Sequence, residues 1–92
     1  MNLMIKQSSS FKKTVKKLSA LQKQVLDKEV KKLLIDPTIG ARKKGDLDFL
    51  RVHKFKCLKQ EFLLGYMHQE SEMILTLLKL GVHENFYRDI KK

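Results

Sequence analysis

The chain has 92 residues, of which 42% are hydrophobic, and its 20 Lys and Arg against 10 Asp and Glu leave a net charge of +10. This length supports a single domain, residues 1–92, and the apolar content excludes a disordered basic tail. A charge this large destabilises the compact state through self-repulsion, so we expect it to serve an anionic partner. Nucleic acid is the first candidate, an acidic protein the second and an anionic membrane surface the third.

Cysteine usage and hydropathy predict a cellular compartment. Cys57 is the single cysteine of the sequence, so no intramolecular disulfide can form, as is typical of a reducing cytosol. The N-terminal segment is too short and too polar for a signal peptide, and no window approaches the roughly 18 apolar residues of a membrane span. We therefore expect a cytoplasmic protein with no membrane partner.

The first half of the chain predicts one strand and then helical structure. A short strand is expected over residues 2–6, and apolar residues at helical spacing cover residues 9–35. Ser8 to Ser10 can cap the first turn, and a Ser-x-x-Gln capping box at Ser19 predicts a second helix, or a kink in one long helix. Pro37 ends the helical segment, because the residue before a proline is excluded from the helical conformation.

The second half predicts strands. Residues 37–47 form a connection, and strand-like segments follow at about 48–57, 61–68 and 73–80, with polar breaks short enough for hairpins. The order β-α-α-β-β-β predicts an α+β domain. In it, two helices pack on a mainly antiparallel four-stranded sheet, and a short C-terminal helix follows.

The last apolar run stops at Gly81 and is followed by a group of chemically versatile side chains. An imidazole, two aromatic rings and a guanidinium come within a few positions, at His83, Phe86, Tyr87 and Arg88. Hydrogen-bonding groups on the rim of a rigid sheet are the arrangement that a catalytic or binding site needs. A structural interpretation also stays open, in which His83 caps the final helix and the rings dock it on the core.

Basic residues gather upstream of this segment. Arg51 and His53 are two positions apart in a predicted strand, so both project from the same face, whereas Lys54 and Lys56 have the opposite parity. The run Arg42-Lys43-Lys44 adds charge to the connection before that strand. His53 also allows the interpretation of an ordinary solvated strand residue.

Four segments together resemble the RelE/ParE superfamily of bacterial type II toxins. They are Gly-Asp-Leu at 45–47, Leu50-Arg51-Val52-His53-Lys54-Phe55-Lys56, Leu63-Leu64-Gly65-Tyr66 and Leu80-Gly81-Val82-His83-Glu84-Asn85-Phe86-Tyr87. The resemblance covers nearly the whole chain. It implies a toxin that is neutralised by a cognate antitoxin, for which we expect an acidic segment.

The superfamily divides by target. RelE-like members bind in the ribosomal A site and cut mRNA there without a metal or other cofactor, whereas ParE-like members inhibit DNA gyrase and are not nucleases. Many nuclease members carry an arginine where this chain has Leu63, and the YafQ-like branch instead relies on histidines. The closest pattern is therefore the histidine-dependent one. It predicts a ribosome-dependent mRNA endonuclease, with a ParE-like gyrase inhibitor as the alternative.

For the nuclease, the resemblance and the chemistry imply a set of site residues. Histidine exchanges protons near neutral pH and arginine stabilises a phosphorane, so the predicted catalytic residues are His83, His53 and Arg51. Aromatic rings stack bases and cations contact phosphates. The predicted RNA-binding residues are accordingly Lys54, Lys56, Arg42, Lys43, Lys44, Phe86, Tyr87 and Arg88.

Overall fold

The computed structural model describes residues 3–47 and 49–82, which form two helices and five strands. In chain order these are β1 (Met4–Gln7), α1 (Ser9–Lys16), α2 (Ala20–Ile35), β2 (Ala41–Arg42), β3 (Arg51–Cys57), β4 (Gln60–Gln69) and β5 (Ile74–Val82). Single 3-10 turns lie at Gly45–Leu47 and Glu70–Glu72. None of the helices in these ranges is long and apolar enough to cross a membrane.

The five strands form one sheet in the order β1-β5-β4-β3-β2. β1 runs parallel to β5, and every other pair is antiparallel. The predicted α+β class and the packing of helices on a mainly antiparallel sheet are confirmed. The predicted number of four strands is wrong by one, because β2 is only two residues long and has no alternating pattern to reveal it. The predicted C-terminal helix lies outside the described residues.

Serine caps set the starts of both helices. The Ser8 Oγ accepts from the Phe11 N–H at 3.0 Å and donates to the Leu78 carbonyl at 2.6 Å, so it also ties α1 to β5. Ser19 and Gln22 form the predicted capping box, with reciprocal bonds of 3.2 and 2.9 Å. The break predicted near Ser19 is therefore a boundary between two helices, and each cap stabilises its helix by about 1 kcal/mol.

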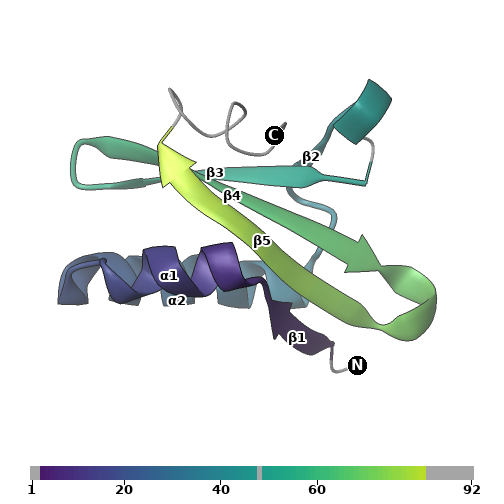
Figure 1. Cartoon of the computed structure of the whole chain (residues 1–92), viewed down its shortest axis with the longest axis horizontal. Coiled ribbons are helices and arrows are strands. Elements are labelled where there is room, and N and C mark those ends of the chain that lie inside the picture. Colours follow the sequence, from purple (N-terminus) through teal and green to yellow (C-terminus); the bar gives the residue numbers. More distant parts are fainter. Residues whose placement is uncertain (1–2, 48, 83–92) are drawn as a thin grey trace.

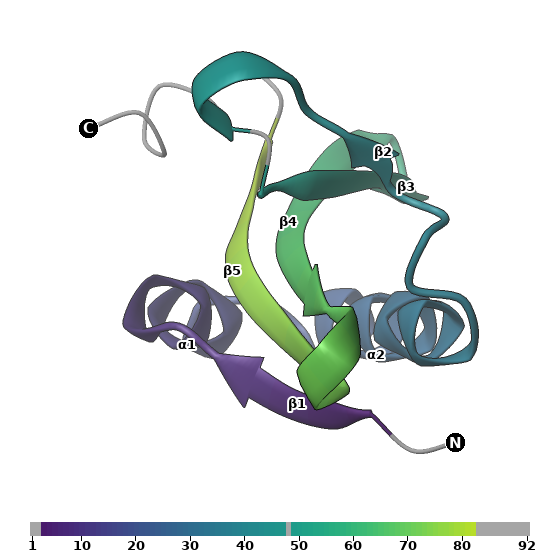
Figure 2. The same cartoon turned by 90° about the vertical axis from the view of Figure 1, so that its right-hand side faces the viewer.

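Both helices lie side by side on one face of the sheet, called here the helix face (Figures 1 and 2). The main core fills the space between the two helices and this face of the sheet. It consists of Phe11, Leu26 and Leu33 from the helices and Phe55, Cys57, Phe62, Leu64, Tyr66, Leu75, Leu77 and Leu80 from the strands. Each large apolar side chain buried in this way contributes about 1.5–3 kcal/mol.

The opposite face of the sheet, called here the distal face, carries a smaller apolar cluster. Leu50, Val52 and Leu63 are buried there, and Leu78 packs against them. The strands that bear this cluster are joined by hairpins at opposite ends of the sheet (Figure 1). The β3–β4 turn contains Leu58 at a φ of 57°, a left-handed conformation that a leucine adopts at some cost.

Candidate nucleic-acid interface

The two faces of β3 carry different basic residues, as the two-residue period of a strand predicts. His53 lies on the helix face, where it contacts Glu29 of α2, and Arg51 projects to the same side. Lys54 and Lys56 project from the distal face, and both are exposed. Within residues 3–47 and 49–82, neither lysine forms an ion pair. The predicted pairing of Arg51 with His53 on one face is thus confirmed.

His53 is held between the sheet and α2. Its Nε2 lies 2.6 Å from the Glu29 Oε1, and the other Glu29 oxygen lies 3.0 Å from the Lys32 ammonium. The His53 and Glu29 side chains are only 15% and 12% exposed, and the imidazole stacks on the Phe55 ring. These contacts favour a role in fixing α2 on the sheet over the predicted catalytic role, because the imidazole is neither aimed at solvent nor uncommitted.

The Glu29 carboxyl is perturbed by the same contacts. Burial raises its pKa, but the hydrogen bonds from His53 and Lys32 and their charges outweigh burial, so the pKa lies below its ordinary value. The carboxylate is therefore ionised when folded at neutral pH and its charge is compensated. Glu29 was not predicted from the sequence. One signal existed, since it occupies a core position in the stripe formed by Leu26, Val30 and Leu33.

Arg51 fastens the loop between α2 and β2. Its Nη1 donates to the carbonyls of Thr38 at 3.2 Å and Gly40 at 3.0 Å. The Tyr66 hydroxyl bonds to the same loop, donating to the Pro37 carbonyl at 2.6 Å and accepting from the Gly40 N–H at 3.0 Å. We call these bonds of Arg51 and Tyr66 the clasp. A Cβ at Gly40 would lie 2.6 Å from that hydroxyl, so only glycine allows the close approach. Burial raises the pKa of the Tyr66 phenol, which keeps it a donor.

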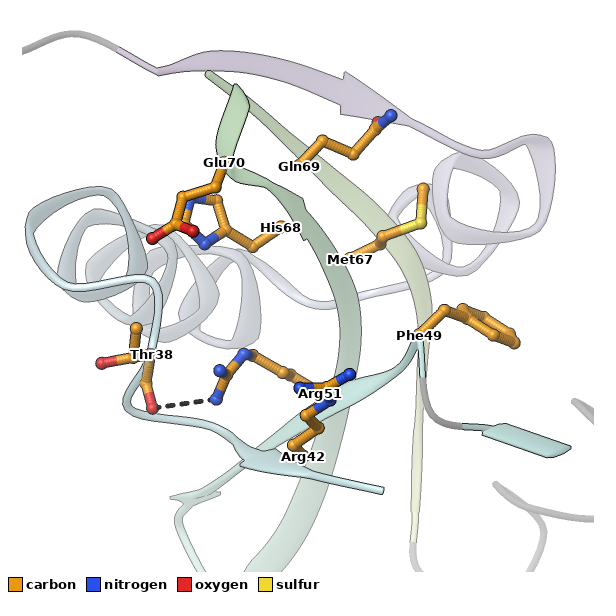
Figure 3. Close-up of a pocket in the computed structure, with 8 residues that line it drawn as sticks. All are labelled: Thr38, Arg42, Phe49, Arg51, Met67, His68, Gln69 and Glu70. Carbon is orange, nitrogen blue, oxygen red and sulfur yellow. Dashed lines mark hydrogen bonds between the residues drawn. The ribbon is translucent and has the colours of Figure 1, made fainter. Parts of the chain in front are cut away.

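A cavity of about 340 Å³ opens beside this clasp, at the end of the sheet where β4 extends past β3. We call it the end pocket (Figure 3). Arg51 and Arg42, which face each other across the β2–β3 pair, line it together with His68 and the half-exposed Phe49. The structure thus brings together two predicted site residues, Arg42 and Arg51, with two that had no predicted role.

The distal face brings the end of β5 close to the two lysines of β3. Lys54 pairs with Leu63, which in turn pairs with Gly81, so these three residues form one row across the sheet. Neighbouring strands lie about 4.8 Å apart, which places Gly81 roughly 10 Å from Lys54 along that row. In the next row Val82 lies at the level of Phe55, between Lys54 and Lys56. The last described strand therefore ends level with both lysines.

The remaining predicted site residues divide into two groups. Lys43 and Lys44 follow β2 directly, with the Lys43 N–H donating to the Leu50 carbonyl at 2.9 Å and Lys44 exposed. The predicted residues beyond β5, which are His83, Phe86, Tyr87 and Arg88, lie outside the described residues. Cys57 is buried, and within residues 3–47 and 49–82 no group of three His, Cys, Asp or Glu side chains converges on a metal position.

Solved structures share this fold. E. coli toxin RelE, in the free state of a mutant with two arginine-to-alanine substitutions, has a TM-score of 0.74 at 19% identity, with 91% of this chain and 86% of that chain covered. The toxin–antitoxin complex RelBE2 from Mycobacterium tuberculosis gives 0.70 at 12% identity, with 90% and 100% covered. The solution structure of the conserved hypothetical protein HP0892 from Helicobacter pylori gives 0.55 at 25% identity, with 88% and 94% covered. The helix-on-sheet arrangement is thus a RelE-like fold.

The family follows from the sequence itself. The model of the ParE-like toxin of type II bacterial toxin–antitoxin systems matches residues 5–91, nearly the whole chain. The chain belongs to this family, and the predicted membership of the RelE/ParE superfamily is confirmed. Comparison with curated proteins gives no match.

Proposed function

We propose that this toxin is a cytoplasmic endoribonuclease that cuts mRNA on the ribosome without a metal and is neutralised by its cognate antitoxin. One observation carries the proposal. Lys54 and Lys56 project, exposed and without an ion pair among the described residues, from β3 at the level where β5 ends at Val82, with β4 between the two strands. His83 comes directly after that strand in the sequence. Two cations and a histidine are the groups that RNA cleavage needs.

The chemistry assigns a task to each group. Attack of a ribose 2′-OH on the adjacent phosphate requires a base, and departure of the 5′-oxygen requires an acid. His83 can take the proton of the 2′-OH as the base and then, as the acid, give it to the departing 5′-oxygen, because an imidazole exchanges protons near neutral pH. The ammonium groups of Lys54 and Lys56 stabilise the extra negative charge of the phosphorane. Phe86 or Tyr87 stacks a base of the single strand, and Arg88 contacts a phosphate.

The helix-face residues take a different place in this proposal. His53 is bonded to Glu29, and Arg51 holds the carbonyls of Thr38 and Gly40. Both side chains thus fix elements of the fold. We therefore propose Lys54 and Lys56 for the electrostatic role that the sequence predicted for Arg51, and we leave His83 as the proton-transfer residue.

An antitoxin partner fits the charge of the chain. Solved complexes of the same fold pair RelE with the antitoxin RelB. A net charge of +10 favours an acidic segment that masks the distal-face lysines of this toxin. Arg42, Lys43 and Lys44 then extend the basic surface beyond β3, toward ribosomal RNA or toward the antitoxin.

One observation favours a second candidate, a ParE-like inhibitor of DNA gyrase without nuclease activity. Leu63, which lies between Lys54 and Gly81, is completely buried in the distal-face apolar cluster. The position that holds a phosphate-binding arginine in many nuclease members therefore offers no charge here. Such an inhibitor needs a protein-binding surface and no imidazole.

A pair of assays separates the two candidates. Purified toxin is incubated with translating ribosomes and the mRNA is mapped by primer extension, while a parallel reaction measures supercoiling by gyrase. The nuclease proposal predicts discrete cuts, and it predicts that Lys54→Ala/Lys56→Ala lowers the cleavage rate by at least about 100-fold. The control Lys23→Ala/Lys28→Ala removes the same charge from exposed positions on α2 and should leave the rate unchanged. Intact mRNA together with inhibited supercoiling would establish the second candidate instead.

A further inference from the structure

The end pocket has its own chemistry, separate from the distal-face lysines. It lies where the loop after α2 approaches the last residues of β4, so it opens at the end of the sheet (Figure 3). Its volume of about 340 Å³ falls within the range of small-molecule sites, which begins near 300 Å³. The space is thus sufficient for one unit of a larger ligand.

The cationic side of the pocket is held in a fixed position. Arg51 uses Nη1 alone for its bonds to Thr38 and Gly40, so its Nη2 and Nε donors have no partner among the described residues. Arg42 stands opposite Arg51 in the β2–β3 register and also lines the cavity. Guanidinium groups bind phosphate oxygens through paired N–H donors, and a guanidinium already oriented by the protein loses less entropy in doing so.

The other sides of the pocket suit a base and a sugar. Phe49, which is 47% exposed, and Met67 are the apolar residues of the lining, and Figure 3 shows them on the other side of β4 from His68 and Glu70. An aromatic ring presented to solvent is the usual platform for a base of single-stranded RNA. The carboxylate of Glu70 repels a free anion but accepts hydrogen bonds from the amino groups of a base or from a ribose hydroxyl.

We propose that the end pocket binds one nucleotide of single-stranded RNA, with its phosphate on Arg42 and Arg51 and its base against Phe49. This inference rests on the proposed function, because it supplies that function with a second contact on the RNA. The pocket lies at the start of β3, whereas the cleavage site is proposed further along the strand at Lys54 and Lys56. Arg51 projects to the helix face and the two lysines to the distal face, so an RNA strand that reaches both sites passes around the end of the sheet, and the bound nucleotide then fixes the register of cleavage.

The experiment measures fluorescence anisotropy of a short labelled oligouridylate against the full chain over a series of salt concentrations. Phe49→Ala should weaken binding about 10-fold, because a stacked base is lost, and Phe49→Tyr, which keeps the ring, should bind like the wild type. Arg42→Ala should reduce the slope of log affinity against log salt by about 0.7, the value for one phosphate contact on a single strand.

Matched controls lie away from the pocket. Leu58, 81% exposed in the hairpin at the other end of the sheet, provides an apolar control, and Lys28 on α2 provides a charge control. Leu58→Ala should bind RNA like the wild type. Lys28→Ala should keep its salt slope. Circular dichroism on every variant establishes that a loss of binding is not a loss of fold.

Several outcomes would contradict the proposal that the end pocket binds a nucleotide. They are a wild type that fails to bind the oligonucleotide, a folded Phe49→Ala that binds it normally, or a Phe49→Ala that weakens only the complex with an acidic antitoxin peptide. Primer extension on ribosomes separates this failure from failure of the proposed function. Cuts that persist without oligonucleotide binding refute the pocket alone, and binding that follows the predicted pattern without any cuts refutes the nuclease alone.

Discussion

The two faces of β3 show how one strand divides its basic residues between structure and function. On the helix face, His53 is bonded to Glu29, and the Nη1 of Arg51 is bonded to two backbone carbonyls, so both side chains are anchored inside the protein. On the distal face, Lys54 and Lys56 are exposed and form no ion pair within the described residues. Residue type alone does not separate these roles. The partner that the fold places opposite each side chain does.

The difference has an energetic basis. A buried or half-buried charge costs several kcal/mol unless partners compensate it, so the Glu29 carboxylate on the helix face requires its contacts with His53 and Lys32. An exposed lysine has no such requirement, but it adds to the self-repulsion of a chain with a net charge of +10. Keeping it is useful only if an external anion meets it. The comparison therefore predicts that helix-face substitutions alter stability and that distal-face substitutions alter activity.

The largest expected effect concerns His83, the residue that directly follows β5. As the proposed proton-transfer group it should be worth roughly 100- to 10,000-fold in rate. His83→Ala should therefore be expressible in cells without antitoxin, and it should still fold. Growth after induction provides the measurement, with Lys28→Ala as the control that stays toxic. Full toxicity of His83→Ala would remove this residue from the mechanism.

The next effect concerns Glu29 on the helix face. Glu29→Ala removes the partner of His53 and Lys32 and should lower the free energy of unfolding by about 2 kcal/mol. Chemical denaturation measures this change. The control is Asp27→Ala, which breaks the exposed pair with Lys31 on the same helix and should cost less than about 1 kcal/mol. Equal losses in the two variants would show that the buried pair has no special role.

A smaller loss is expected at the clasp of the α2–β2 loop. Tyr66→Phe deletes the hydroxyl that accepts from the buried Gly40 N–H and donates to the Pro37 carbonyl, and it should cost about 1–2 kcal/mol. Thr14→Val, which removes an exposed hydroxyl bonded within α1, should change stability by no more than about 0.5 kcal/mol. A Tyr66→Phe variant as stable as the wild type would mean that the loop is held by Arg51 alone.

The smallest effect is a pH dependence. The pKa of Glu29 is lowered by folding, so the stability it contributes is fully present above its unfolded pKa of about 4.5 and is lost as the pH falls through the lower folded pKa. The stability difference between wild type and Glu29→Gln should therefore be constant near neutral pH. It should shrink below about pH 4. Denaturation at a series of pH values tests this, and a difference that grows on acidification would contradict the sign.

Local signals in the sequence were sufficient for the helices and for most of the strands. Ser8, Ser19 and Pro37 act within a few residues, so the helix boundaries could be predicted from capping and proline chemistry alone. The short strand β2 could not, because two residues hold no periodic pattern. Its existence depends on pairing with β3, which is a contact between distant parts of the chain.

The candidate site was predictable only in part for the same reason. The alternation of Arg51 and His53 against Lys54 and Lys56 followed from strand geometry, but which side the helices cover did not. Apolar residues occur on both sides of β3, with Val52 on one and Phe55 on the other. The partner of His53 lies 24 residues away in sequence. The end pocket likewise combines residues from a loop, from the three strands β2, β3 and β4, and from two turns.

The most direct test of the division between the two faces measures both stability and activity in two variants. Lys54→Ala/Lys56→Ala and His53→Ala are compared with the wild type for the free energy of unfolding and for the rate of mRNA cleavage on ribosomes. We expect the lysine variant to unfold like the wild type and to lose at least about 100-fold in rate. We expect His53→Ala to lose about 2 kcal/mol and to cleave at the wild-type rate. A stable His53→Ala without activity, beside a fully active lysine variant, would contradict the account.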